Sequence, residues 1–216
     1  MSDTLTQLIA KVQGALGDDG TIFTTALCTG AVRQALDEWN LRVPVHAAVT
    51  ITGVNDQYEY ELSDEDSNAV EILDILCQGD NNNEQDVSIT FDEYNEDERL
   101  FFRLRQPVTS SDTLIVRYKI HHTINGLDSA TESTLRSYHD QAIMNGAAFF
   151  AIMTRATSRI ETINLSKDQS DNYREVAAAY AQAFAMRIRA EAGKKRAPVG
   201  EPDTRAWNDG YHGWGQ

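Results

Sequence analysis

The feature that most constrains the fold is a change of period in the hydrophobic pattern of this 216-residue chain. Residues 4–16 and 24–41 carry apolar side chains three and four positions apart, which is the spacing of one helix face. Residues 45–122 instead contain short alternating segments separated by turn residues, at 45–54, 57–63, 69–79, 86–94, 99–107 and 113–122. Helical spacing returns at 135–153 and again from 166 to 192. The order predicted is therefore two helices, about six strands and two longer helices.

The links between the strand segments are too short for crossover helices, so we expect an antiparallel sheet. A two-helix hairpin cannot bury helix faces as wide as these, and sequence-distant helices must therefore pack together. The predicted fold class is α+β, a four-helix bundle with an antiparallel β-rich insertion between helices 2 and 3 and an extended C-terminal arm. The expected divisions are helices 1 and 2 in residues 1–43, the insertion in 44–122, helices 3 and 4 in 123–192, and the arm in 193–216.

Individual residues refine this prediction. Gly17 is placed to end the first helix, and Pro44 prevents the second from continuing. The third helix puts Tyr138 and Met153 on its apolar face, and its Gly146 allows a neighbouring helix to approach closely.

The formal net charge of −14 comes from one segment of the chain. Between Arg42 and Arg99 there is no Lys or Arg, whereas 16 of the 33 acidic residues lie there; the other 17 are balanced by the 19 basic residues. This segment is either a solvated surface that keeps the protein soluble or a surface that faces a passing polyanion without binding it. A protein that grips DNA would have the opposite charge. The candidate channel or surface residues are Asp64, Glu65, Asp66, Asp92, Glu93, Glu96 and Asp97.

No pattern in the chain indicates catalysis. There is no GxSxG, no P-loop and no GxGxxG that opens a helix. His121 and His122 are adjacent at the end of a predicted strand, so their side chains point to opposite faces and do not easily share a metal. Cys28 and Cys77 are expected to be buried free thiols. We expect no enzyme activity, no metal and no cofactor, with a hydrolase that uses converging acids as the alternative.

Residues 80–86 place acidic and amide side chains at alternate positions, as in a calcium loop, but lack the turn glycine and distal glutamate of an EF-hand. A polar hairpin tip is the competing interpretation.

The N-terminal residues lack the basic and apolar regions of a signal peptide, and no apolar run approaches the ~20 residues of a membrane span. We therefore expect a cytoplasmic protein, or one assembled there, with no membrane partner.

The last residues of the chain form an aromatic, glycine-spaced arm. Its glycines disfavour a helix, at about 1 kcal/mol each. Burial of three aromatic side chains contributes roughly 5–9 kcal/mol, whereas ordering each residue costs about 1–2 kcal/mol. We therefore expect the arm to become ordered on a partner surface, and the alternative is that it folds back over its own core. The candidate partner-binding residues are Arg205, Trp207, Tyr211 and Trp214.

Three stretches of the chain carry a resemblance to a known family. They are ALDEWNLRVP (35–44), LIVRYKIHHTINGLDSATESTL (114–135) and YHDQAIMNGAAFFAIMTRA (138–156). These stretches resemble the head-to-tail adaptor, or connector, proteins of tailed bacteriophages. In those proteins a strand ending in Tyr and an extended HT segment lead to a helix with a Gly-Ala-Ala stretch, here Gly146, Ala147 and Ala148. The resemblance covers the two N-terminal helices and most of residues 112–190, through packing patterns and not through catalytic signatures.

The resemblance implies a structural protein of the virion neck, assembled in the host cytoplasm as a ring, usually of twelve copies, beneath the portal. Its partners would be the portal protein, tail or tail-completion proteins and further copies of itself. DNA would pass through the ring without specific binding, and the C-terminal arm would dock into the portal. The alternative function is a binding module in which the β-rich insertion recognises a carbohydrate or calcium.

Overall fold

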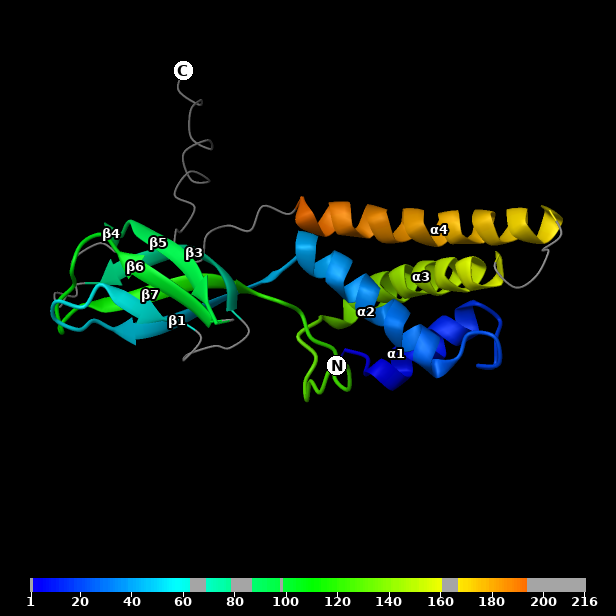
Figure 1. The fold of residues 1–216 in the computed structure, drawn as a ribbon, viewed down its shortest axis with the longest axis horizontal. Helices are drawn as coiled ribbons and strands as arrows, with labels where there is room; N and C mark the ends of the chain where they lie inside the picture. Colours follow the sequence, from blue (N-terminus) through cyan, green and yellow to red (C-terminus); the bar gives the residue numbers. More distant parts are fainter. Residues whose placement is uncertain (1, 63–68, 79–86, 98, 161–166, 194–216) are drawn as a thin grey trace, which may run out of the picture.

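The computed structural model describes residues 2–62, 69–78, 87–97, 99–160 and 167–193. Helices form one lobe and strands form another, and the two lobes lie end to end (Figure 1). The α+β class and the antiparallel pairing predicted from the sequence are both confirmed. The helices are α1 (Leu5–Ala15), α2 (Thr25–Arg42), the short 3-10 helix η1 (Ser137–His139), α3 (Asp140–Ile160) and α4 (Lys167–Ala192). The strands are β1 (Val45–Thr52), β2 (Glu59–Glu61), β3 (Ala69–Gln78), β4 (Val87–Ser88), β5 (Phe91–Glu96), β6 (Arg99–Leu104) and β7 (Thr113–Ile120).

Local signals set the ends of the first two helices. Thr4 caps α1 through a capping box, in which its side chain accepts from the backbone N–H of Gln7 and the Gln7 side chain accepts from the backbone N–H of Thr4. Gly17 follows the helix with a φ of +65°, the left-handed conformation that glycine adopts without strain. Thr24 caps α2, which ends before Pro44. The predicted boundaries of these two helices are confirmed to within two residues.

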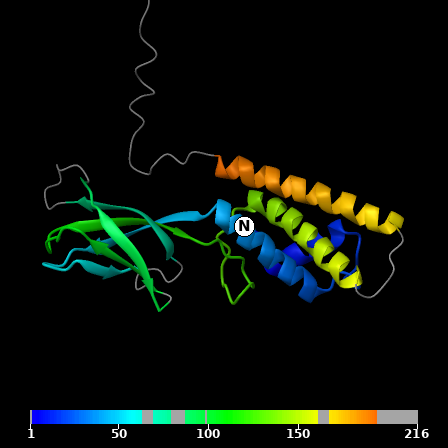
Figure 2. The ribbon, with the colours of Figure 1, turned by 45° about the horizontal axis from the view of Figure 1, so that its top comes forward.

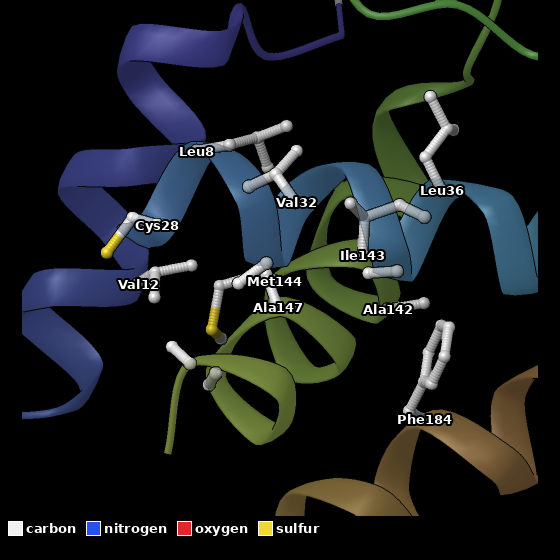
Figure 3. Close-up of a cluster of buried hydrophobic side chains, with 14 of the residues drawn as sticks. Leu8, Val12, Cys28, Val32, Leu36, Ala142, Ile143, Met144, Ala147 and Phe184 are labelled. Carbon is white, nitrogen blue, oxygen red and sulfur yellow. The ribbon is translucent and has the colours of Figure 1, made fainter. Parts of the chain in front are cut away.

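One hydrophobic core joins all four helices. Helix α3 packs along α2 and α4, and α1 covers the outer side of the α2–α3 pair (Figure 2). Phe184 of α4 points toward this core, where α2 and α3 supply mainly small and aliphatic side chains (Figure 3). The core residues drawn there with labels are Leu8, Val12, Cys28, Val32, Leu36, Ala142, Ile143, Met144, Ala147 and Phe184.

At Gly146, α3 lies close to both α2 and α4. A Cβ atom at this position would lie 3.0 Å from the Cβ of Ala35 on α2 and 3.0 Å from the ring of Phe184 on α4. The close approach predicted for this glycine is therefore confirmed, because any larger residue would press on both neighbouring helices.

We expect Gly146→Leu to lower the free energy of unfolding by about 1–3 kcal/mol, the usual cost of overpacking. The better helix propensity of leucine offsets less than about 1 kcal/mol of that loss. Urea denaturation followed by circular dichroism at the helix band measures the change. Gly30→Leu is the matched control, because a Cβ at Gly30 of α2 would meet no atom within 4 Å. Equal losses in the two variants would contradict the packing argument.

The strands form two sheets that share a second core. The first sheet has the order β1-β7-β3-β4 and the second the order β2-β6-β5. Side chains from both sheets meet in a cluster that is separate from the helical core, and its fully buried members include Leu62, Ile75, Leu100, Phe102, Leu104 and Leu114. Two passages of the described chain join the lobes, one between α2 and β1 and the other after β7 (Figure 1).

Two details of the sequence-based prediction were wrong. Residues 86–94, predicted as one strand, contain two strands in different sheets: β4 pairs with β3, and β5 pairs with β6. The chain crosses between the sheets at Ile89 and Thr90, where the Ile89 N–H donates to Ile75 O and Thr90 O accepts from the Arg105 N–H. Tyr138 and Met153 were placed on an apolar face, but they are 47% and 46% exposed. Tyr138 precedes α3 and lies in η1, outside the helical register.

Candidate functional site

Several of the residues singled out from the sequence lie outside the described part of the structure. These are Arg205, Trp207, Tyr211 and Trp214 of the arm, Asp64, Glu65 and Asp66 of the acidic segment, and the calcium-like residues 80–86. Their proposed roles stay predictions. None of the described helices is long and apolar enough to span a membrane.

Asp92 and Glu96 lie on β5 opposite arginines of the neighbouring strand β6. Asp92 is paired in register with Arg103, and Glu96 with Arg99. The guanidinium of Arg105 donates to both carboxylate oxygens of Asp92, at 2.8 and 3.2 Å, and this contact lowers the pKa of Asp92. Because these groups are exposed, the pair contributes little to stability. Its effect is to neutralise part of the acidic surface.

Glu93 and Asp97 have structural positions in the β lobe. The Glu93 carboxylate accepts a 2.7 Å hydrogen bond from the backbone N–H of Ile72. Strand β3 shifts register with β7 on both sides of Ile72, so Glu93 caps a backbone group at an irregular part of the ladder. Asp97 follows β5 with a φ of +50° in the turn toward β6, a conformation that Asp tolerates better than most residues. Within the described residues, no group of three or more metal-ligating side chains is placed to hold a metal ion.

Buried polar residues instead gather where the two lobes meet. We call Trp39, Asn40, His122, His139 and Glu191 the junction cluster; all five are 9% exposed or less. Asn40 of α2 and His122 after β7 bond to each other through two hydrogen bonds: the His122 N–H donates to Asn40 Oδ1 at 2.7 Å, and Asn40 Nδ2 donates to His122 O at 3.3 Å. The His122 ring also lies 2.9 Å from Val43 O through Nε2. These bonds fix the end of α2 to the end of β7.

His139 lies at the centre of the junction cluster and is enclosed by aromatic rings. Its ring centroid is 4.9 Å from that of Trp39, 4.2 Å from that of Tyr138 and 6.2 Å from that of His122. Neither ring nitrogen has a hydrogen-bond partner among the described residues. The nearest opposite charge is Glu191 on α4, whose Oε2 lies 3.7 Å from His139 Nε2. Burial lowers the pKa of His139, although the Glu191 carboxylate acts in the opposite direction.

Sequence reasoning did not find the junction cluster. It placed His121 and His122 on opposite faces, which is confirmed because His121 is exposed and His122 is 5% exposed. The sequence did not predict the contact of His122 with Asn40, because 82 positions separate the two residues. Both also lie at the ends of elements, where the hydrophobic period gives no information about neighbours. One sequence signal could have indicated that Asn40 is buried: it follows Trp39 near the end of the apolar face of its helix.

Cys28 and Cys77 are both free, as predicted, but Cys77 is only half-buried. Burial raises the pKa of the Cys28 thiol to about 11. Because the thiolate is the reactive form, we expect Cys28 in the folded protein to resist a thiol reagent at about pH 7.5 and Cys77 to react first. Mass mapping of the alkylated residues checks this order, and full alkylation after denaturation is the control. Reaction at Cys28 before Cys77 would contradict the burial argument.

No known family profile matches the chain, and no curated protein matches it. Among solved structures, one similar chain comes from the neck of an empty GTA particle computed with C6 symmetry. The two chains are 10% identical and overlay with a TM-score of 0.31, over 80% of this chain and 87% of the other. This is a weak likeness of arrangement, and we draw no functional argument from it.

Proposed function

We propose that this protein is a structural head-to-tail adaptor of a tailed phage virion, without catalytic activity. In this role it forms a ring below the portal, extends the DNA channel and joins the head to the tail. Of the three stretches that resemble adaptor proteins, 35–44 lies far in the sequence from the other two, 114–135 and 138–156, which are nearly consecutive.

The observation that carries this proposal is that the three stretches pack on one another. Helix α2, whose C-terminal part belongs to the first stretch, lies along α3 from the third, and Ala35 lies beside Gly146. Asn40 from the first stretch bonds to His122 from the second. His139 from the third contacts both Trp39 and His122. Scattered chance similarities would not be expected to form one packed unit.

The electrostatics of the β lobe also favour this role. Three basic residues on β6 and β7 form ion pairs with acids of neighbouring strands: Arg99 with Glu61, Arg117 with Asp74 and Lys119 with Glu71. Few cations are therefore left to bind phosphates, and DNA would slide past this lobe without being held. Strand β1 favours self-association, because it lies at a sheet edge and carries no Asp, Glu, Lys or Arg over eight residues.

In the proposed assembly the C-terminal arm attaches the ring to the portal, and Arg205, Trp207, Tyr211 and Trp214 are its anchors. The test is affinity capture from cells that produce the particle, with the full chain and with a chain ending at Gly193 as baits. We expect portal-sized ring protein and tail components to be recovered with the full chain, and the portal to be lost with the shorter one. Equal recovery of the portal by both chains would overturn the role of the arm. Recovery of no virion protein by either chain would overturn the adaptor function.

A further inference from the structure

The end of α4 lies against the junction cluster. The last turns of this helix bring Arg187 and Glu191 beside His139, which precedes α3 by one residue. His139 in turn contacts Trp39 of α2 and His122 at the end of β7. The last turns of α4 therefore meet elements of both lobes around one imidazole ring, while Phe184 and Ile188 pack against the helical core.

The charged groups around that ring disfavour a further positive charge on the imidazole. From α4, Arg187 forms an ion pair with Glu191, with 3.2 Å between Nη2 and Oε1, and donates to Tyr138 O at 3.4 Å. Its guanidinium also lies 5.7 Å from the centroid of the Tyr138 ring. Arg136 from the segment before η1 adds a second cation whose charge acts on the imidazole. Of the carboxylates nearby, Asp140 already accepts hydrogen bonds from Ser2 Oγ and the Asp3 N–H.

A protonated His139 would have to compete with Arg187 for the remaining carboxylate, Glu191. The imidazole is 4% exposed, so water cannot replace that partner. From α2 the ring meets the indole of Trp39, which offers no acceptor on its nitrogen, and the His122 ring is engaged with Val43 O. The packed arrangement therefore accommodates a neutral ring and disfavours a charged one.

We propose that His139, Glu191 and Arg187 form an acid-sensitive clasp, which holds the last turns of α4 against the junction between the lobes and releases them when the imidazole is protonated. This clasp does not depend on the adaptor function.

The direction of the pH effect follows from the lowered pKa of His139. When α4 opens, the ring meets water and its pKa returns to the ordinary value of about 6.5. The open state therefore binds protons more tightly than the closed state. The closed state is fully favoured above about pH 6.5, and it is lost progressively as the pH falls from there toward the lowered pKa. Opening is coupled to the uptake of one proton by His139, so the equilibrium constant for opening rises by at most about tenfold for each unit that the pH falls.

Hydrogen exchange measured by mass spectrometry on the full chain tests the clasp. Exchange at pH 7.5, 6.5, 5.5 and 5.0 is corrected for the intrinsic pH dependence of amide exchange. We expect protection in peptides covering residues 185–193 to fall below about pH 6.5, while peptides from β7 keep theirs. His139→Phe should keep the α4 peptides protected at every pH, because a ring of similar size remains and cannot be protonated.

His121→Gln is the matched control, since His121 is exposed and should leave the wild-type profile unchanged. Glu191→Gln removes the carboxylate that compensates the charged ring and should deepen the loss of protection at pH 5.0. If His139→Phe does not fold, His139→Gln replaces it with the same expected flat profile. A flat profile in the wild-type chain, or a pH-dependent profile that persists without His139, would overturn the proposal.

Discussion

Trp39→Ala is expected to lower the free energy of unfolding of the helical lobe by about 3–5 kcal/mol. Trp39 is fully buried and is among the largest buried side chains of the chain. Its ring stacks against Phe184 of α4 at 6.3 Å between centroids and lies 4.9 Å from the His139 ring. The loss comes from packing, because the Trp39 Nε1 has no hydrogen-bond partner among the described residues. Alanine would leave a cavity where α2, η1 and α4 meet.

Guanidinium denaturation followed by far-ultraviolet circular dichroism, which is dominated by the helices, measures this loss. Trp39→Phe is the control, because it keeps an aromatic ring against Phe184 and should cost less than half as much. A loss below about 1 kcal/mol for Trp39→Ala would show that the helices do not depend on this contact, contrary to the packing described above.

Phe102→Ala is expected to have an effect of the same size, about 3–5 kcal/mol, but on the β lobe. Phe102 is fully buried on β6 at the centre of the second core. Its ring stacks on Tyr60 of β2, with 5.3 Å between centroids and 12° between the planes. Among the described elements, the extensive contacts are between two helices or between two strands. The packing lost at Phe102 therefore does not directly weaken the helical core.

Each of these two variants is therefore the control for the other. In hydrogen exchange, Phe102→Ala should reduce the protection of β6 and β7 and leave the α2 and α3 amides unchanged, whereas Trp39→Ala should do the reverse. Equal loss of protection in both lobes from either variant would mean that the chain unfolds as one unit. The two cores would then be coupled through the junction far more strongly than the contacts indicate.

Helices were the part of the fold that the sequence predicted well. The apolar stripe of α2 carries Ala31, Ala35 and Trp39 inward, and all are buried. Capping residues and the glycine after α1 marked the ends, because those positions satisfy local backbone rules that need no tertiary information. Gly146 was also predictable, since a glycine is unfavourable within a long apolar helix face unless a neighbouring helix packs close to it.

The sheets were harder to predict because strand periodicity gives the face of a residue but not its partner strand. Residues 86–94 alternate well enough to suggest a single strand, yet the chain changes sheets at Ile89 and Thr90. Likewise, the sequence placed Glu93 among the channel or surface acids, but did not predict that its carboxylate accepts from the Ile72 N–H of the other sheet. Charge composition does not distinguish a carboxylate facing solvent from one that satisfies a backbone group.

The candidate sites also differ in how far the sequence could predict them. The arm residues and the first acidic group lie outside the described residues, so their functions rest on sequence alone. The junction cluster depends on contacts between residues far apart in the chain, such as Glu191 with His139 and Trp39 with His139. No local pattern predicts such contacts, because the buried histidines differ from surface histidines only after the lobes are assembled.

The location of the protein in the particle tests the adaptor function most directly. A peptide tag placed after Gln216 on chains incorporated into assembled particles can be labelled with gold-conjugated antibody, with untagged particles as the control. Cryo-electron microscopy of the same particles gives the position of the density independently of antibody access. The proposed function predicts a ring of this chain at the vertex where head meets tail. Density on the head shell or at the distal end of the tail, or absence of the chain from purified particles, would contradict it.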